Sequence, residues 1–131
     1  MDVTANDFTL ALMAKSLGLL KSRQEAISGN IANVNTPGYR RRDVDFAGVL
    51  SEAIQSNETA AKTQRIDAVE SAELDVVIDH TFLFRNDAGG VDIDREMAEQ
   101  ARTQLLYNAY TRLVGNRMKL YRAVITEGRS G

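Results

Sequence analysis

The sequence has no cysteine, no tryptophan, one proline and one histidine among its 131 residues. Without cysteine there is no disulfide, no zinc or iron–sulfur site built on thiolates and no thiol nucleophile. For the same reason, the sequence does not indicate whether the protein works in an oxidising or a reducing compartment. A single histidine supplies little for a metal site or a Ser/His relay. We therefore expect no cofactor, no metal and no small-molecule substrate, and a chain this short excludes a large enzyme.

Long apolar runs are also missing. No stretch of about 18 consecutive apolar residues occurs, and the start, residues 1–4, lacks the positive region and apolar core of a cleaved signal peptide. With 44% hydrophobic residues, the composition is that of one soluble domain. We expect neither a secretory precursor nor a membrane-spanning chain.

Charge is unevenly distributed along the chain, although the net value is only −2. Residues 1–42 carry six Lys/Arg against three acids, and residues 100–131 carry six against one. Residues 66–99 carry two against ten. Basic ends and an acidic middle predict attraction between parts of the chain or between copies, and hence assembly that depends on salt.

Two long helices are predicted at the ends. In the first, apolar residues alternate in steps of three and four, with Gln24 as the one polar member, which is typical of a coiled-coil seam. The second should begin near Asp92, because acids fill its first turn and basic residues its last turns. Its apolar stripe is broad and indicates more than one neighbour. The candidate packing residues are Leu10, Met13, Leu17, Leu20, Ile27 and Ile31 in the first helix and Leu105, Leu106, Leu113, Leu120 and Val124 in the second.

The middle of the chain differs from both ends. Residues 43–54 predict a short helix or extended arm, the polar residues 55–65 a mobile loop, and the β-branched cluster in 66–84 one or two short strands. The expected fold is mainly α: residues 1–35 and 91–131 form two long amphipathic helices, which pack as a coiled-coil-like pair or bundle in an assembly. Residues 36–90 form a turn, an arm, a loop and a short irregular or β-containing segment.

Two such helices can cover each other on one face only. A few hundred Å² of remaining apolar surface would favour association by several kcal/mol at about 25 cal/mol per Å². An antiparallel pair of two basic helices would need acidic groups from the middle or from another copy. We therefore expect a subunit of a larger structure, with copies of itself as partners.

The densest local signal is the place where the first helix must stop. Pro-Gly fits the centre of a type II turn, and asparagines satisfy terminal backbone groups and tolerate left-handed backbone. The end of a helix explains the proline and the glycine. The clustered asparagines are equally consistent with a local role at the helix end and with a role in fixing the register and the number of partner helices. These residues are Asn30, Asn33, Asn35, Thr36, Pro37, Gly38 and Tyr39.

Three other functions are less consistent with the sequence. Residues 40–42, all arginine, could bind phosphate, but acids follow at once and no nucleic-acid motif is present. Lysines on the first helix allow a membrane-surface site, although a solvated face is the simpler interpretation. Asp75, Asp79 and His80 lie close together, yet no nucleophile elbow, phosphate loop or third metal ligand accompanies them. We expect no nucleic acid as a partner and no enzyme activity.

Residues 23–39, which include SGNIANVNTPGY, resemble the N-terminal signature of bacterial flagellar axial proteins, the rod and hook family. RDVDF at 42–46, VDIDREMA at 91–98 and QLLY at 104–107 resemble the proximal rod proteins of the FlgB type. The chain is too short for the inserted domains of distal rod and hook proteins. Another short proximal rod protein of the same family is the nearest alternative.

The resemblance implies a structural subunit of the proximal rod, at the base of the torque-transmitting drive shaft and export channel. Such a subunit would be exported through the flagellar type III apparatus without a cleaved signal and would lie in the basal body, on the periplasmic side of the inner membrane. The implied partners are copies of itself, other rod proteins, the adaptor between rod base and membrane ring, and the export gate.

Overall fold

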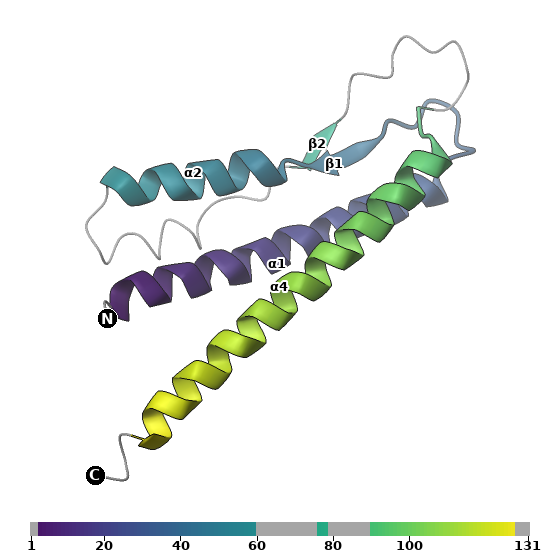
Figure 1. Ribbon diagram of the computed structural model, residues 1–131. Coiled ribbons are helices and arrows are strands. Elements are labelled where there is room, and N and C mark those ends of the chain that lie inside the picture. Colours follow the sequence, from purple (N-terminus) through teal and green to yellow (C-terminus); the bar gives the residue numbers. More distant parts are fainter. Residues whose placement is uncertain (1–2, 60–75, 79–89, 128–131) are drawn as a thin grey trace.

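The computed structural model of the protein describes residues 3–59, 76–78 and 90–127. The elements, in chain order, are α1 (Val3–Ala32), β1 (Arg42–Val44), α2 (Phe46–Thr59), β2 (Val76–Ile78) and α4 (Ile93–Glu127). The predicted architecture is confirmed: the protein is mainly helical, with two long helices at its ends and a short β-containing middle (Figure 1). None of the described helices is long and apolar enough to cross a membrane.

The helices α1 and α4 pack against each other in opposite directions (Figure 1). At about 1.5 Å per residue, the 30 residues of α1 and the 35 of α4 make rods of roughly 45 and 50 Å. Their axes lie close where α1 ends and α4 begins, and they diverge toward the start of α1 and the end of α4 (Figure 1). The pair is therefore joined at one end and open at the other.

The seam between the two helices alternates apolar and polar residues. On α1 the buried apolar positions Leu20 and Ile27 are flanked by Ser16 and Asn30, which are also buried. On α4 the buried positions are Glu96 and Thr103, seven residues apart. A seven-residue repeat keeps one stripe of a helix facing its partner. The seam is thus more polar than the predicted apolar one.

The middle of the chain packs on another part of α1. Val44 of β1 and Val49 of α2 form a small apolar core with Leu19, and Phe46 and Leu50 pack against it. In Figure 1, α2 lies along α1 on the side away from α4. Because this helix runs to Thr59, the loop predicted from residue 55 is wrong as far as residue 59, and the rest of that loop lies outside the described residues.

The segment between the turn and α2, residues 40–45, is short and extended and is called the arm below. Strand β1 pairs with β2 in antiparallel orientation, with Arg42 opposite Ile78 and Val44 opposite Val76. The sequence predicted a strand in the β-branched segment, and β2 confirms it. The sequence did not indicate that Arg42–Val44 would be the partner strand, since three residues that begin with the last arginine of the run have no clear strand pattern.

Candidate functional site

The chain reverses direction after α1 at residues 36–39. Gly38 has a φ of 75°, and the backbone N–H of Tyr39 donates to the carbonyl oxygen of Thr36 at 3.2 Å. With Pro37 in second place and positive φ only in third place, this is a type II turn. The turn predicted at these residues is confirmed, and it explains the glycine.

Asn33 closes the last turn of α1 with its side chain. Its amide donates to the carbonyl oxygen of Gly29 at 2.8 Å, and its Oδ1 accepts from the hydroxyl of Thr36 at 3.2 Å. Neither Asn33 nor Asn35 has a positive φ. The predicted satisfaction of the helix end is confirmed for Asn33, whereas the left-handed backbone that asparagine tolerates is not used here.

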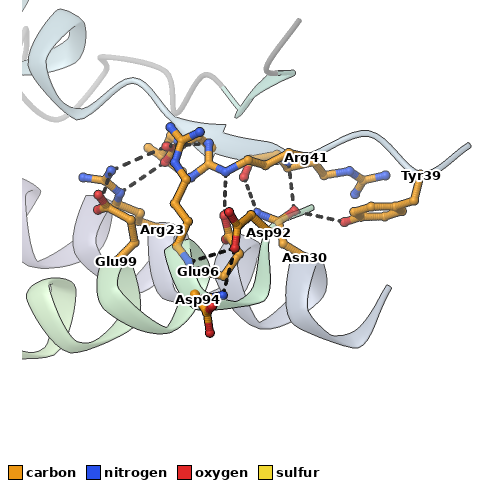
Figure 2. A network of polar contacts seen from close by, with 12 residues as sticks. Arg23, Asn30, Tyr39, Arg41, Asp92, Asp94, Glu96 and Glu99 are labelled. Atoms are coloured by element: carbon orange, nitrogen blue, oxygen red, sulfur yellow. Dashed lines mark hydrogen bonds and ion pairs between the residues drawn. The ribbon is translucent and has the colours of Figure 1, made fainter. Parts of the chain in front are cut away.

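Asn30 joins α1 to the arm and to α4. Its amide nitrogen donates to the carbonyl oxygen of Arg42 at 2.7 Å, and its Oδ1 accepts the backbone N–H of Arg42 at 2.9 Å. The same amide nitrogen donates to Oε2 of Glu96 at 2.9 Å, and the hydroxyl of Tyr39 donates to Oδ1 at 3.3 Å (Figure 2). This fully buried side chain therefore acts like a neighbouring strand for Arg42.

Arg41 and Glu96 form a buried ion pair at the centre of this network. Nε of Arg41 lies 2.6 Å from Oε1 of Glu96, and Nη1 lies 3.0 Å from Oδ2 of Asp43 (Figure 2). The exposed fractions are 3% for the arginine and 0% for the glutamate. Burial alone would lower the pKa of Arg41, but the hydrogen bond and charge of Glu96, with Asp43 adding to them, raise it above its usual value.

A second cation extends the network along the seam. Arg23 of α1 lies 3.1 Å from Asp43 in the arm and 3.2 Å from Glu99 of α4, measured from Nε to Oδ1 and from Nη2 to Oε2. Next to it, the amide of Gln24 donates to Oε1 of Gln104 at 3.2 Å. The helices are therefore joined by polar contacts at three successive levels.

The start of α4 is fixed by its own cap. The carboxylate of Asp92 accepts the backbone N–H groups of Asp94 and Arg95 at 3.0 and 3.3 Å, as an N-cap residue does. The helix start predicted near Asp92 is confirmed, since α4 begins at Ile93. Glu96, which the sequence suggested only as a charge near the positive end of the helix, is held in place as the partner of Arg41.

The outward side of α4 carries a line of apolar residues, here called the outer stripe. At about 100° per residue, Leu105, Leu113, Leu120 and Val124 lie within about 100° of one another around the helix axis, and Met97 lies about 80° further round, with the exposed Ala101 and Ala109 between them. The exposed fractions are high: 71% for Leu105 and 70% for Val124. The outer stripe consists of Met97, Leu105, Leu113, Leu120 and Val124.

The end of α4 is apolar on a second side as well. An open groove there is lined by Met118, Tyr121 and Ile125 together with Lys119, Arg122 and Thr126. The hydroxyl of Tyr121 is buried and has no hydrogen-bond partner among the described residues. Exposed apolar side chains therefore occur on more than one side of this end of the helix.

The predicted packing residues fall into two groups. Leu20 and Ile27 are buried inside the chain, and Leu10, Met13, Leu17, Ile31 and Leu106 are half-buried. The other four, Leu105, Leu113, Leu120 and Val124, are exposed on α4. The described part of the chain therefore covers the apolar surface of α1 far better than that of α4.

Charged side chains that could bind an ion are dispersed in the part of the chain that the structure describes. Of the three arginines at 40–42, the middle one is buried against Glu96, which leaves two exposed side chains rather than a row for phosphate. No cluster of three potential metal ligands occurs within the described ranges. Asp75, Asp79 and His80 lie outside them.

Comparison with known proteins places these features in a family. The family model described as "Flagella basal body rod protein" matches residues 17–40, which contain the second half of α1, the turn and the start of the arm. The flagellar basal body rod protein FlgB of Borrelia hermsii is 32% identical, and the match covers 91% of this chain and 96% of that protein. The chain belongs to the FlgB family of flagellar basal body rod proteins. The FlgB proteins of Escherichia coli K12 and Bacillus subtilis 168 are 33% and 27% identical, over 93% and 92% of this chain and 96% and 95% of theirs.

FlgB membership confirms the resemblance carried by the helix stop and by both ends of the chain. It makes this chain a flagellar basal body rod protein, and its relatives are structural rod proteins. The sequence did not indicate the parts of Arg23, Arg41, Asp43 and Glu99 in the network, and it indicated Glu96 only as a charge near the helix start. The seven-residue spacing of Ser16, Arg23 and Asn30, which places three polar side chains on one side of α1, is a signal for Arg23 alone.

Proposed function

We propose that this FlgB-family chain is a structural subunit of the proximal rod, which assembles with copies of itself through its terminal helices. In this proposal it forms the base of the torque-transmitting drive shaft and part of the wall of the export channel. Family membership supports a rod subunit, and the exposed apolar side of α4 supports assembly through the terminal helices.

The outer stripe is the observation that carries this proposal. Protein surfaces rarely keep a continuous line of large apolar side chains in water, and such patches mark interaction sites. The stripe runs from Met97 to Val124, over most of α4. Covering it by helices of neighbouring subunits would bury the surface that the chain itself leaves exposed. On α1 the half-buried Leu10, Met13, Leu17 and Ile31 would contribute the edges of the same contacts.

Long helices also suit the mechanical role. A shaft under torque needs stiff elements that are locked side by side, and interdigitated helices are close-packed and resist shear far better than loops do. The network at the joined end of α1 and α4 would hold each subunit's two helices together as one body. The chain has no cysteine, so a rod of this protein rests on packing and polar contacts without disulfides.

Partners and location follow from the same proposal. Besides copies of itself, the subunit would contact other rod proteins, the adaptor at the rod base and the export gate. It would lie on the periplasmic side of the inner membrane and reach that place through the flagellar export apparatus without a cleaved signal. A structural role of this kind needs no enzyme activity, and the relatives' names support it.

The test introduces one charge into a packing surface and follows export and motility separately. Leu17→Asp and Ile31→Asp on α1, and Leu105→Asp on α4, should leave export of the subunit intact and abolish rod assembly and swimming. Ser28→Asp and Thr111→Asp place the same charge at exposed polar positions of the same helices and should leave swimming unchanged. Motile cells carrying the first three variants would contradict the packing proposal.

A further inference from the structure

The polar network lies where α1 ends and α4 begins, in the hairpin that these two helices form. It brings three separate segments together at one carboxylate. Glu96 of α4 receives Arg41 from the arm at one oxygen and Asn30 from α1 at the other, at 2.6 and 2.9 Å. All three side chains are buried. Glu96 of α4 therefore has partners both on α1 and in the arm (Figure 2).

The length of the connection between the two helices does not fix how they align. Residues 33–92 separate them, which is far more chain than a tight helical hairpin needs, so sliding α4 along α1 by one repeat is not prevented by the connection. The apolar positions do not fix it either, because a seven-residue repeat matches itself after a slip of seven residues.

The polar positions distinguish one alignment from the others. In the observed one, Glu96 meets Asn30, Glu99 meets Arg23 and Gln104 meets Gln24. A slip of seven residues in either direction takes Glu96 away from both Asn30 and Arg41. It takes from the buried guanidinium of Arg41 its nearest carboxylate and leaves Asp43 as an acidic partner, and the cost of breaking a buried ion pair opposes the slip.

We propose that Glu96 is the residue that sets the register of α4 against α1, through Arg41 and Asn30. A slipped α4 would present different residues at each level of the subunit, so the register decides where along the hairpin the outer stripe lies. This inference rests on the proposed function only where it assumes that neighbouring subunits cover the outer stripe. The register itself is a property of the single chain.

The buried ion pair of Arg41 and Glu96 is better suited to selecting one register of the two helices than to raising the free energy of unfolding. Replacing a buried ion pair by apolar residues of similar volume often leaves stability unchanged or raises it, whereas removing one partner lowers it. The double variant Arg41→Leu/Glu96→Leu should therefore remain folded and yet lose the single register. A purely structural role would predict a change in stability without a change in register.

Cysteine cross-linking can read the register directly, because the chain has no cysteine of its own. The pair Gln24→Cys and Gln104→Cys reports the observed alignment, in which these side chains hydrogen-bond. Gln24→Cys with Met97→Cys, or with Thr111→Cys, reports a slip of seven residues in either direction. The thiol reagent must be shorter than the roughly 10 Å that seven helical residues span. Dilute protein and mixtures of the single-cysteine chains separate links within a chain from links between chains.

In the otherwise unchanged protein, only the observed pair should cross-link. In Arg41→Leu/Glu96→Leu, we expect the slipped pairs to cross-link as well, with helical content and melting temperature retained by circular dichroism. The matched control is Glu99→Leu, which removes a half-buried ion pair on the same helices and should keep the single register. Even if Arg41→Leu or Glu96→Leu alone unfolds the protein, the double variant still decides the question.

Exclusive cross-linking of the observed pair in the double variant would overturn the proposal, as would slipped cross-links in Glu99→Leu alone. Both readouts come from the isolated chain. A failure of rod assembly in the charge variants of α1 and α4 is measured in cells instead, so the register proposal and the proposed function can fail independently.

Discussion

Replacing Leu105 by alanine should weaken assembly and leave the folded subunit intact. Leu105 lies in the middle of the outer stripe with 71% of its surface exposed. The folded chain therefore gains little from this side chain. Alanine has the highest helix propensity, and surface substitutions of this kind change stability by less than about 0.5 kcal/mol.

The expected loss follows from the exposed area. Leucine exceeds alanine by three carbon atoms, each of which contributes about 0.8 kcal/mol when fully buried. If a neighbour covers the 71% that is now exposed, the loss per contact is about 1.7 kcal/mol. Since 1.4 kcal/mol is a factor of ten in an equilibrium constant, the concentration at half-association should rise roughly 20-fold.

Sedimentation velocity over a series of protein concentrations measures this shift, and thermal unfolding followed by circular dichroism measures the fold. Leu20→Ala is the matched control, because Leu20 is 0% exposed inside the chain. That variant should lose about 2–5 kcal/mol of folding stability. Association of Leu105→Ala at the same concentration as the parent protein would refute the assignment of the outer stripe to an interface.

Three further predictions concern the turn and the network. Gly38→Val places a β-branched residue at a φ of 75°, which should cost about 1–2 kcal/mol of folding stability by chemical denaturation; an unchanged midpoint would contradict the turn. Asn30→Ala leaves the backbone N–H of Arg42 and one oxygen of Glu96 without their partner, so stability should fall by about 1–3 kcal/mol for each unsatisfied group, and a loss below about 0.5 kcal/mol would show that Asn30 does not hold the arm. The pKa of Arg41 is held above the usual value of an arginine, so its contribution to stability is fully present below that usual value and is lost only as the pH rises through the raised one. Arg41→Lys, with an ordinary pKa of about 10.4, should lose stability relative to the parent as the pH rises toward about 10.5, and parallel pH profiles of the two proteins would contradict this.

The two long helices could be predicted from the sequence because their signals are local. Apolar periodicity, the acids after Asp92 and the stop at Pro37-Gly38 act within a few turns of the chain. The helix at Phe46–Thr59 was only half predicted, since its second half, residues 55–59, is polar and resembles a loop. Packing of Val49 and Leu50 against α1 explains its first turns, and propensity alone does not indicate its length.

The face that each helix turns inward could not be read from the apolar pattern. The predicted seam of α1 includes Leu20 and Ile27, which are buried, but also Leu17 and Ile31, which are only half-buried, and it leaves out the buried Ser16 and Asn30. The reason is that polar residues recur every seven positions on this side of α1, at Ser16, Arg23 and Asn30, and the last two are satisfied by partners in distant segments. Those partnerships are non-local, so no window of the sequence contains both members.

The arginines at 40–42 show the same limit. As a row of three charges they resemble a surface patch, and the sequence suggested phosphate binding as one use. Arg41 instead enters the interior, because Glu96 lies within reach from another helix. A buried cation can be anticipated only once its carboxylate partner has been placed.

The central claim, that neighbouring subunits cover the outer stripe in the rod, is tested most directly by thiol labelling of single-cysteine variants. The chain has no cysteine, so Leu105→Cys, Leu120→Cys and, as the buried reference, Leu20→Cys each carry one reporter. On isolated subunits, a water-soluble maleimide should label the first two and spare the third. In purified basal bodies, the account predicts that labelling at 105 and 120 falls to the level of the buried reference. Labelling at both positions as fast in basal bodies as in free subunits would contradict it.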